Sequence, residues 1–141
     1  MRQMEWTEAS QFLLDGTRTA TIATVGPDGR PHAVPVWFTV DERQVVFTTS
    51  SQTAKAKNLQ RDPRVALSVD DQAPPFAFVT IRGRAELVAQ PDDLLTWTTR
   101  IAQRYVGPDR ALEVGTKSAE IDDLLVRIAV DSFTAYADVV T

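Results

Sequence analysis

The chain has 141 residues, and its content of 43% hydrophobic and 24% charged residues is that of a globular protein with one domain and a hydrophobic core. Its 15 basic and 19 acidic residues give a formal net charge of −4, which argues against a nucleic-acid-binding protein because such proteins present a basic surface. The lack of cysteine and the single histidine exclude disulfides, a thiol nucleophile and metal sites built on thiolates or several histidines.

The N-terminal part of the chain predicts a helix over residues 7–15. Ala9, Phe12 and Leu13 fall on one side of such a helix, and Gly16 stands where a left-handed residue ends it. The first residues, MRQMEWTEAS, contain no signal-peptide core, and no apolar run in the chain reaches the roughly 18 residues of a membrane span. We therefore expect a cytoplasmic protein that does not enter a membrane.

Two strands are predicted next, over residues 19–25 and 31–40, with a Gly-Pro-Asp-Gly turn at 26–29 between them. Pro35 lies within the second strand and cannot donate a ladder hydrogen bond, so this strand must be bulged or lie at a sheet edge. Two explanations stay open. The interruption can leave backbone groups at 34–37 free for a planar heterocycle, or the proline can simply protect an edge from aggregation.

The most informative stretch, residues 45–64, reads VVFTTSSQTAKAKNLQRDPR. It opens as a strand and continues with four hydroxyl-bearing residues, Thr48, Thr49, Ser50 and Ser51. Thr53 can cap a helix that ends before Pro63, because proline disfavours helical dihedrals in the residue before it. A helix N-terminus has unpaired N–H groups and a partial positive charge, so hydroxyls and a lysine there favour an anion such as a phosphate.

Two lysines lie in this predicted helix and face different directions. Lys55 and Asn58 are three residues apart and share a face, whereas Lys57 lies about 200° around the helix from Lys55. We therefore expect a single anion to be bound by only one of these two lysines. We favour Lys55 because it is nearer the N-terminus of the helix. The alternative is that the corner is an ordinary polar surface that binds nothing.

The remainder of the chain predicts further strands and helices. The strands are expected over residues 65–69, 76–88, 124–130 and 133–139. Gly83 marks a bulge or bend within its strand. A helix starts at Pro91 and stops before Gly107, whereas the segment 110–123 is a short helix or a loop. Short strands joined by tight turns indicate a mainly β, antiparallel barrel or sandwich.

The sequence contains no complete set of catalytic side chains. It lacks the glycine-rich motifs of dinucleotide and nucleoside-triphosphate sites, and it has no G-x-S-x-G nucleophile elbow. A serine triad would need His32, which stands at a strand start beside a turn, and the carboxylates are scattered over turns and helix starts. A cofactor-binding corner without a nucleophile, a metal set or an acid–base pair suggests that a bound cofactor supplies the chemistry.

Four segments together resemble the pyridoxamine 5′-phosphate oxidase-like split β-barrel superfamily. They are TATIATVGPDGRPHAVPVWF, VVFTTSSQTAKAKNLQRDPRVAL, TIRGRAEL and RYVGP, and the pattern K-x-x-N-L-x-R-D-P-R-V from Lys55 to Val65 is the most specific of them. The resemblance covers nearly the whole chain and is strongest to the branch of reductases that depend on the deazaflavin coenzyme F420. It implies a six- to seven-stranded antiparallel split β-barrel of the α+β class with short flanking helices, as a single domain over residues 1–141.

The resemblance also implies a homodimer in which each cofactor lies in a groove between the subunits. The residues assigned to cofactor binding are Val34, Pro35, Val36, Trp37, Thr48, Thr49, Ser50, Thr53, Ala54, Lys55, Lys57, Asn58, Phe76 and Phe78. Phe76 and Phe78 match positions from which the second subunit contributes aromatic contacts.

Some of these residues are assigned to particular parts of the cofactor. By resemblance, Thr48, Lys55 and Asn58 hold its phosphate and ribityl portion, and residues 34–37 lie against its tricyclic ring. Lys57 would attract an acidic tail from longer range, an effect that salt screens.

The activity that the resemblance implies is hydride transfer between C5 of the deazaflavin and an unsaturated small molecule such as a quinone, an enone or a linear tetrapyrrole. No residue is assigned as a catalytic acid, since solvent can supply the proton. Two alternatives stay open: an FMN-binding oxidoreductase of the same barrel, and a protein that binds a cofactor or tetrapyrrole without turning it over. The single lysine favours F420 over FMN, because the oxidase relatives place more cationic residues around the phosphate.

Overall fold

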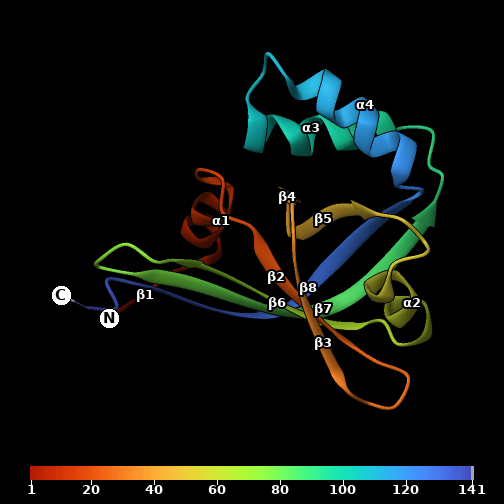
Figure 1. The fold of residues 1–141 in the computed structure, drawn as a ribbon. Helices are drawn as coiled ribbons and strands as arrows, with labels where there is room; N and C mark the ends of the chain where they lie inside the picture. The colour runs from red at the N-terminus through yellow and green to blue at the C-terminus, as the bar shows by residue number, and fades with distance from the viewer. Residues whose placement is uncertain (141) are drawn as a thin grey trace.

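The computed structural model of the protein describes residues 1–140 and contains an eight-stranded antiparallel sheet with four α-helices (Figure 1). The elements are β1 (Arg2–Gln3), α1 (Trp6–Leu14), β2 (Ala20–Val25), β3 (Pro31–Val36), β4 (Thr39–Asp41), β5 (Gln44–Thr49), α2 (Ala54–Arg61), β6 (Arg64–Asp71), β7 (Ala77–Ala89), α3 (Leu94–Val106), α4 (Ala111–Ile121) and β8 (Leu124–Ala137). The predicted α+β, mainly β class is confirmed. In this part of the chain, no helix is long and apolar enough to cross a membrane.

The sheet forms a barrel that is split along one side. Its strand order is β3-β2-β6-β7-β8-β5-β4, with β1 paired to β8, and all pairs are antiparallel. The edge strands β3 and β4 are neighbours in sequence, linked by Trp37 and Phe38, but within residues 1–140 no ladder joins them. The chain therefore crosses the split at this link. Pro35 lies in β3, which is an edge strand of the sheet. Of the two predicted alternatives, a bulge or a sheet edge, the structure has the edge.

The interior of the barrel holds the main hydrophobic core. Alternate residues of neighbouring strands point inward, so that Leu67 and Val69 of β6 pack near Val79 and Ile81 of β7. Phe47 of β5 is fully buried in the same cluster. A side-chain period of two along each strand produces this arrangement, because only one face of each strand meets the interior.

Several boundaries differ from the sequence-based expectation. The sheet has eight strands instead of the six to seven expected. The predicted strand over 31–40 is divided into β3 and β4, and the short β1 is an additional strand. The two predicted C-terminal strands are one continuous strand, β8, which bulges at Asp131. The predicted irregularity at Gly83 is confirmed, although the extra residue belongs to β8. The segment 110–123, left open between helix and loop, contains α4.

Helices α3 and α4 form a hairpin that lies over β4 and β5 (Figure 1). Gly115 permits the close packing of the two helices, because a Cβ there would lie 2.5 Å from Thr99 Oγ1 and 2.7 Å from its Cα. The Thr98 hydroxyl donates to the Gly115 carbonyl at 2.8 Å. Arg100 attaches the hairpin to the barrel by donating to the Val40 carbonyl at 3.1 Å. The inner face of the hairpin is thus fixed against the split.

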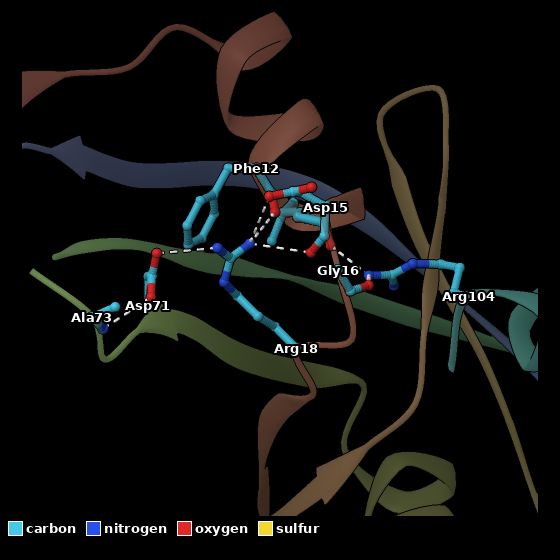
Figure 2. A network of polar contacts seen from close by, with 8 residues as sticks. Phe12, Asp15, Gly16, Arg18, Asp71, Ala73 and Arg104 are labelled. Carbon is cyan, nitrogen blue, oxygen red and sulfur yellow. Dashed lines mark hydrogen bonds and ion pairs between the residues drawn. The ribbon is translucent and has the colours of Figure 1, made fainter. Parts of the chain in front are cut away.

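A polar network attaches α1 to the barrel (Figure 2). Arg18 donates to the carbonyl oxygens of Phe12 and Asp15, each at 3.1 Å, and its guanidinium lies 4.3 Å from the centre of the Phe12 ring. The same guanidinium pairs with Asp71, at the end of β6, at 3.1 Å. Arg104 reaches in from α3 and donates to carbonyls at the C-terminal end of α1. Three elements distant in sequence are joined here.

Replacement of Asp71 by asparagine is expected to lower stability at neutral pH but not in acid. The Ala73 N–H and the Arg18 guanidinium hold the pKa of the Asp71 carboxyl below its usual value. A carboxyl with a depressed folded pKa contributes stability above its unfolded pKa, about 3.9, and loses this contribution as the pH falls through the folded value. Urea unfolding of wild type and variant from pH 7 to about pH 3 should show the difference in unfolding free energy shrinking.

The control for this prediction is Asp70→Asn, at the neighbouring exposed position. Its stability difference from wild type should stay small and nearly constant with pH. An Asp71→Asn difference that is equally large at both ends of the pH range would show that the carboxylate charge is not what stabilises the network.

Candidate functional site

A cavity of about 300 Å³ lies at the split of the barrel. The end of β3, the end of β5, the start of α2 and the α3–α4 hairpin surround it. Its lining residues are Pro35, Val36, Trp37, Thr48, Thr49, Ser50, Thr53, Lys55, Thr98, Ile101, Ser118, Ile121 and Asp122. Most of the residues predicted to bind a cofactor therefore surround one space, although they come from separate segments.

Lys55 stands in the first turn of α2, beside a capped helix N-terminus. Thr53 is the N-cap, as predicted, and its hydroxyl accepts the Ala56 N–H at 3.3 Å. The Lys55 ammonium is half-buried, and burial lowers its pKa although the charge of Asp122 partly raises it. Within residues 1–140, no carboxylate lies at ion-pair distance from this ammonium. A half-buried cation at a helix N-terminus without a carboxylate at ion-pair distance favours an external anion.

The hydroxyl groups of this corner are more occupied than the sequence suggests. Thr48 donates to Asp122 Oδ2 at 2.7 Å. The Thr49 and Thr53 hydroxyls bond each other at 3.0 Å, and Thr53 also donates to the Ser50 carbonyl at 2.9 Å. The Ser50 hydroxyl accepts a backbone N–H at 3.2 Å, which leaves its own hydrogen for a ligand. An anion here would be held chiefly by the lysine, by Ser50 and by the free N–H groups in the first turn of α2.

Two acidic residues at the end of α4 close the opposite side of the corner. Asp123 accepts the Ser51 N–H at 2.7 Å and the Ser51 hydroxyl at 2.8 Å, and these bonds fix the β5–α2 loop and lower the pKa of Asp123. Burial raises the pKa of Asp122, although the Thr48 hydrogen bond and the Lys55 charge partly lower it. Burial thus outweighs the attraction between Lys55 and Asp122, as expected for two groups that share a cavity without a close ion pair.

Trp37 forms the apolar wall of the cavity. Its ring stacks on Tyr105 of α3, with centroids 4.6 Å apart and planes inclined by 10°. The Tyr105 hydroxyl accepts the Phe38 N–H at 3.2 Å and donates to the Arg18 carbonyl at 3.0 Å, so the stack has a fixed base. Trp37 still exposes 41% of its surface, and this part of the indole is open to a flat ligand.

Asn58 does not share the cavity with Lys55, contrary to the expectation from their spacing. Its buried amide donates to Thr24 Oγ1 at 3.0 Å and accepts from Arg61 Nη2 at 3.0 Å. The spacing of the two residues along α2 is as predicted, but the amide turns toward β2, where the Thr24 hydroxyl offers a buried partner. Asn58 therefore holds α2 on the barrel.

The other predicted residues also lie outside the cavity lining. Val34 packs against the core, and Ala54 and Lys57 are exposed. Lys57 faces away from the lining, as helix geometry predicts. Phe76 and Phe78 lie at the β6–β7 hairpin, which extends away from α2 and from the α3–α4 hairpin (Figure 1). Within one protomer these two rings are therefore remote from the cavity.

The α3–α4 hairpin supplies the part of the site that sequence analysis missed. Its contributions are Thr98, Ile101, Ser118, Ile121 and Asp122. The apolar stripe of α3 indicates packing, and no local pattern tells that the end of α4 returns to β5. The available signal is the pair Asp122–Asp123 directly before a buried strand, since carboxylates in such a place need polar partners.

A larger groove of about 470 Å³ lies on the outer side of β2, β6 and β7. Arg64, Arg82 and Arg84 line it, so it is a rival anion site. Arg64 is paired with Asp62 at 2.7 Å, Arg82 donates to Ser132 at 3.2 Å, and all three arginines are exposed. No helix among the described residues begins in this groove. The corner at Lys55 combines a less hydrated cation with free helix N–H groups, and we favour it for a phosphate.

Comparison with known proteins assigns the chain to a family. Residues 6–135 match the pyridoxamine 5′-phosphate oxidase family. The chain belongs to this family. Its fold is similar to that of a conserved hypothetical protein from Mycobacterium tuberculosis, with a TM-score of 0.82 and 30% identity over 96% of this chain and 86% of that one. An F420 reductase gives a TM-score of 0.68 and 27% identity over 87% and 94% of the two chains.

Two curated proteins match parts of the chain. The pyridoxine/pyridoxamine 5′-phosphate oxidase of Burkholderia lata is 44% identical over 61 residues, which are 43% of this chain and 28% of that enzyme. The 5a,11a-dehydrotetracycline/5a,11a-dehydrooxytetracycline reductase of Streptomyces rimosus subsp. rimosus is 33% identical over 72 residues, 48% of this chain and 51% of that one. The matches thus span between about a quarter and a half of these relatives.

Proposed function

We propose that the protein is an oxidoreductase that binds the deazaflavin coenzyme F420 and transfers a hydride between this coenzyme and an unsaturated small molecule. The observation that carries the proposal is the half-buried Lys55 ammonium, which has no ion-pair partner within residues 1–140 and stands at the N-terminus of α2 in a cavity walled by Trp37. A quinone, an enone or a linear tetrapyrrole is the proposed class of acceptor.

The residues of the cavity fit the parts of such a cofactor. The phosphate would be held by Lys55, by the hydroxyl of Ser50 and by the first-turn N–H groups of α2. The tricyclic ring would lie against the segment 35–37, at the end of edge strand β3, where Trp37 follows the strand and exposes its indole. When bound, the reduced deazaflavin supplies the hydride. The chain orients it and excludes water, and no side chain is proposed as a proton donor.

The proposed assembly is a homodimer with the cofactor between the subunits. The cavity of one protomer, about 300 Å³, is at the lower limit for sites that enclose ligands of this kind. Phe76 and Phe78 lie on a hairpin remote from the cavity of their own protomer, from which they could reach a neighbouring one (Figure 1). In this proposal they cover the exposed side of the ring bound to the other subunit.

The choice of F420 over FMN is supported by the charge of the site. Among the described residues, Lys55 is the one cation that lines the cavity, whereas several cations would suit the doubly charged phosphate of FMN. Similarity to an F420 reductase over 87% of the chain supports the same choice. The partial match to a pyridoxine/pyridoxamine 5′-phosphate oxidase favours the FMN alternative, so we retain it as the second candidate.

Titration of the purified protein with F420 and, separately, with FMN tests this proposal. Quenching of the intrinsic fluorescence of each ring reports binding. We expect F420 to bind at least tenfold more tightly than FMN. Tight FMN binding without F420 binding would reverse the ranking of the two cofactors.

A turnover assay separates an enzyme from a carrier. Reduced F420 and the protein are mixed with a panel of quinones, enones and bilins, and the return of the oxidised deazaflavin absorbance is followed. At least one acceptor class should reoxidise the coenzyme faster than it does in the absence of protein. Tight binding of F420 with no turnover on any class would instead favour a non-catalytic cofactor- or tetrapyrrole-binding protein.

A further inference from the structure

The carboxylate of Asp122 occupies the same cavity as the Lys55 ammonium. It accepts the Thr48 hydroxyl at 2.7 Å, and within residues 1–140 this is the one hydrogen bond of its side chain. The end of α4 does not depend on the carboxylate, because the cap there is the Asp122 backbone N–H, which bonds the Ser118 carbonyl at 2.8 Å. The carboxylate is thus directed into the site without being needed to end the helix.

The balance of charge in the cavity follows from these two side chains. Among the described lining residues, Lys55 is the one cation and Asp122 the one anion, and both are half-buried. A singly charged ligand would be attracted by the first and repelled by the second. Each further negative charge on the ligand increases the repulsion as well as the attraction, and burial strengthens both because solvent screens them less.

We propose that Asp122 determines specificity by favouring a singly charged phosphodiester over a doubly charged phosphomonoester. The inference rests on the proposed function, because it concerns the phosphate that Lys55 would hold. F420 carries a phosphodiester, whereas FMN carries a phosphomonoester. The Asp122 carboxylate lies on the α4 side of the corner and accepts the Thr48 hydroxyl, which is therefore not available to donate to a phosphate. Asp122 would thus make the affinity for a ligand depend on the charge of its phosphate and not on its ring.

The test compares two ligands that share one ring. FMN and its phosphate monomethyl ester differ by one methyl group and one negative charge. At about pH 8 the phosphate of FMN is almost entirely dianionic, since its second pKa is about 6, whereas the methyl ester carries one negative charge. Dissociation constants are measured by flavin fluorescence for wild type, Asp122→Asn and Glu120→Gln. The asparagine oxygen can still accept the Thr48 hydroxyl. The glutamine removes the same charge from an exposed position of α4 outside the cavity.

We expect Asp122→Asn to shift the ratio of the two dissociation constants about tenfold toward FMN relative to the wild type, the scale of one unit charge at a half-buried site. This shift should come from tighter binding of FMN, and Glu120→Gln should keep the wild-type ratio within about twofold. The change in the ratio isolates charge from the bulk of the methyl group. An unchanged ratio in Asp122→Asn, or an equal change in Glu120→Gln, would overturn the inference, as would failure of Asp122→Asn to bind either flavin phosphate.

A parallel titration with F420 distinguishes this inference from the proposed function. If F420 binds the wild type but the ester preference does not depend on Asp122, the proposed function stands and the inference fails. If F420 does not bind and Asp122→Asn shifts the ratio toward FMN, the proposed cofactor is wrong and the selection by charge stands.

Discussion

Replacement of Lys55 by alanine is expected to weaken binding of the cofactor by about 1.5–3 kcal/mol, which is more than tenfold in the dissociation constant. The half-buried ammonium has lost part of its hydration, and within the described chain no carboxylate pairs with it. A phosphate at the start of α2 would therefore gain a charge-assisted hydrogen bond that few other groups in the cavity can replace. Fluorescence titration of the variant with F420 measures the loss.

Lys57 provides a matched control for this prediction. It is on the same helix, carries the same charge and is exposed outside the cavity. Lys57→Ala should weaken binding by no more than about 0.5 kcal/mol, the scale of a screened surface interaction. Equal losses in the two variants would mean that the helix attracts the cofactor through its overall charge, and the specific role of Lys55 would be wrong.

Replacement of Gly83 by alanine is expected to destabilise the fold by about 3–5 kcal/mol, near the upper end for single substitutions. A Cβ at this position would lie 2.1 Å from the Ala129 carbonyl oxygen and 3.0 Å from a methyl group of Ile128. The first of these contacts is with the backbone of β8, at the bulge of the β7–β8 ladder. Strand β7 is also paired with β6 on its other side, so it is not free to move away from β8. Relief therefore requires the strands to separate, which a side-chain rotation cannot achieve.

Urea unfolding monitored by tryptophan fluorescence tests the effect of Gly83→Ala. The comparison is Glu86→Ala, which places the same methyl group at an exposed position of the same strand and should change the unfolding free energy by less than about 1 kcal/mol. A Gly83→Ala variant as stable as this control would show that the ladder accommodates a side chain at the bulge.

The corner at residues 45–64 could be predicted from the sequence because local chemistry determines it. Thr53 caps the helix, Pro63 limits its length, and the position of Lys55 in the first turn follows from the helical period. The edge position of Pro35 follows in the same way from the hydrogen bond that proline cannot donate. These rules need no knowledge of the rest of the fold.

The remainder of the site depends on contacts between distant segments. Asp122 meets Thr48 across 74 positions of sequence, and nothing in either segment specifies the other. Asn58 has the predicted position on its helix, but its amide direction depends on Thr24 in another strand. The continuity of β8 was missed because Asp131 and Ser132 interrupt its apolar pattern, and a bulge accommodates them in the ladder. Tertiary pairing decides all three.

A crystal structure of the protein bound to F420 tests the proposed cofactor site most directly. We expect the phosphate within hydrogen-bonding distance of Lys55 Nζ at the start of α2, with the tricyclic ring beside Trp37. A corner that stays empty, or a phosphate that binds at the groove of Arg64, Arg82 and Arg84 instead, would contradict it.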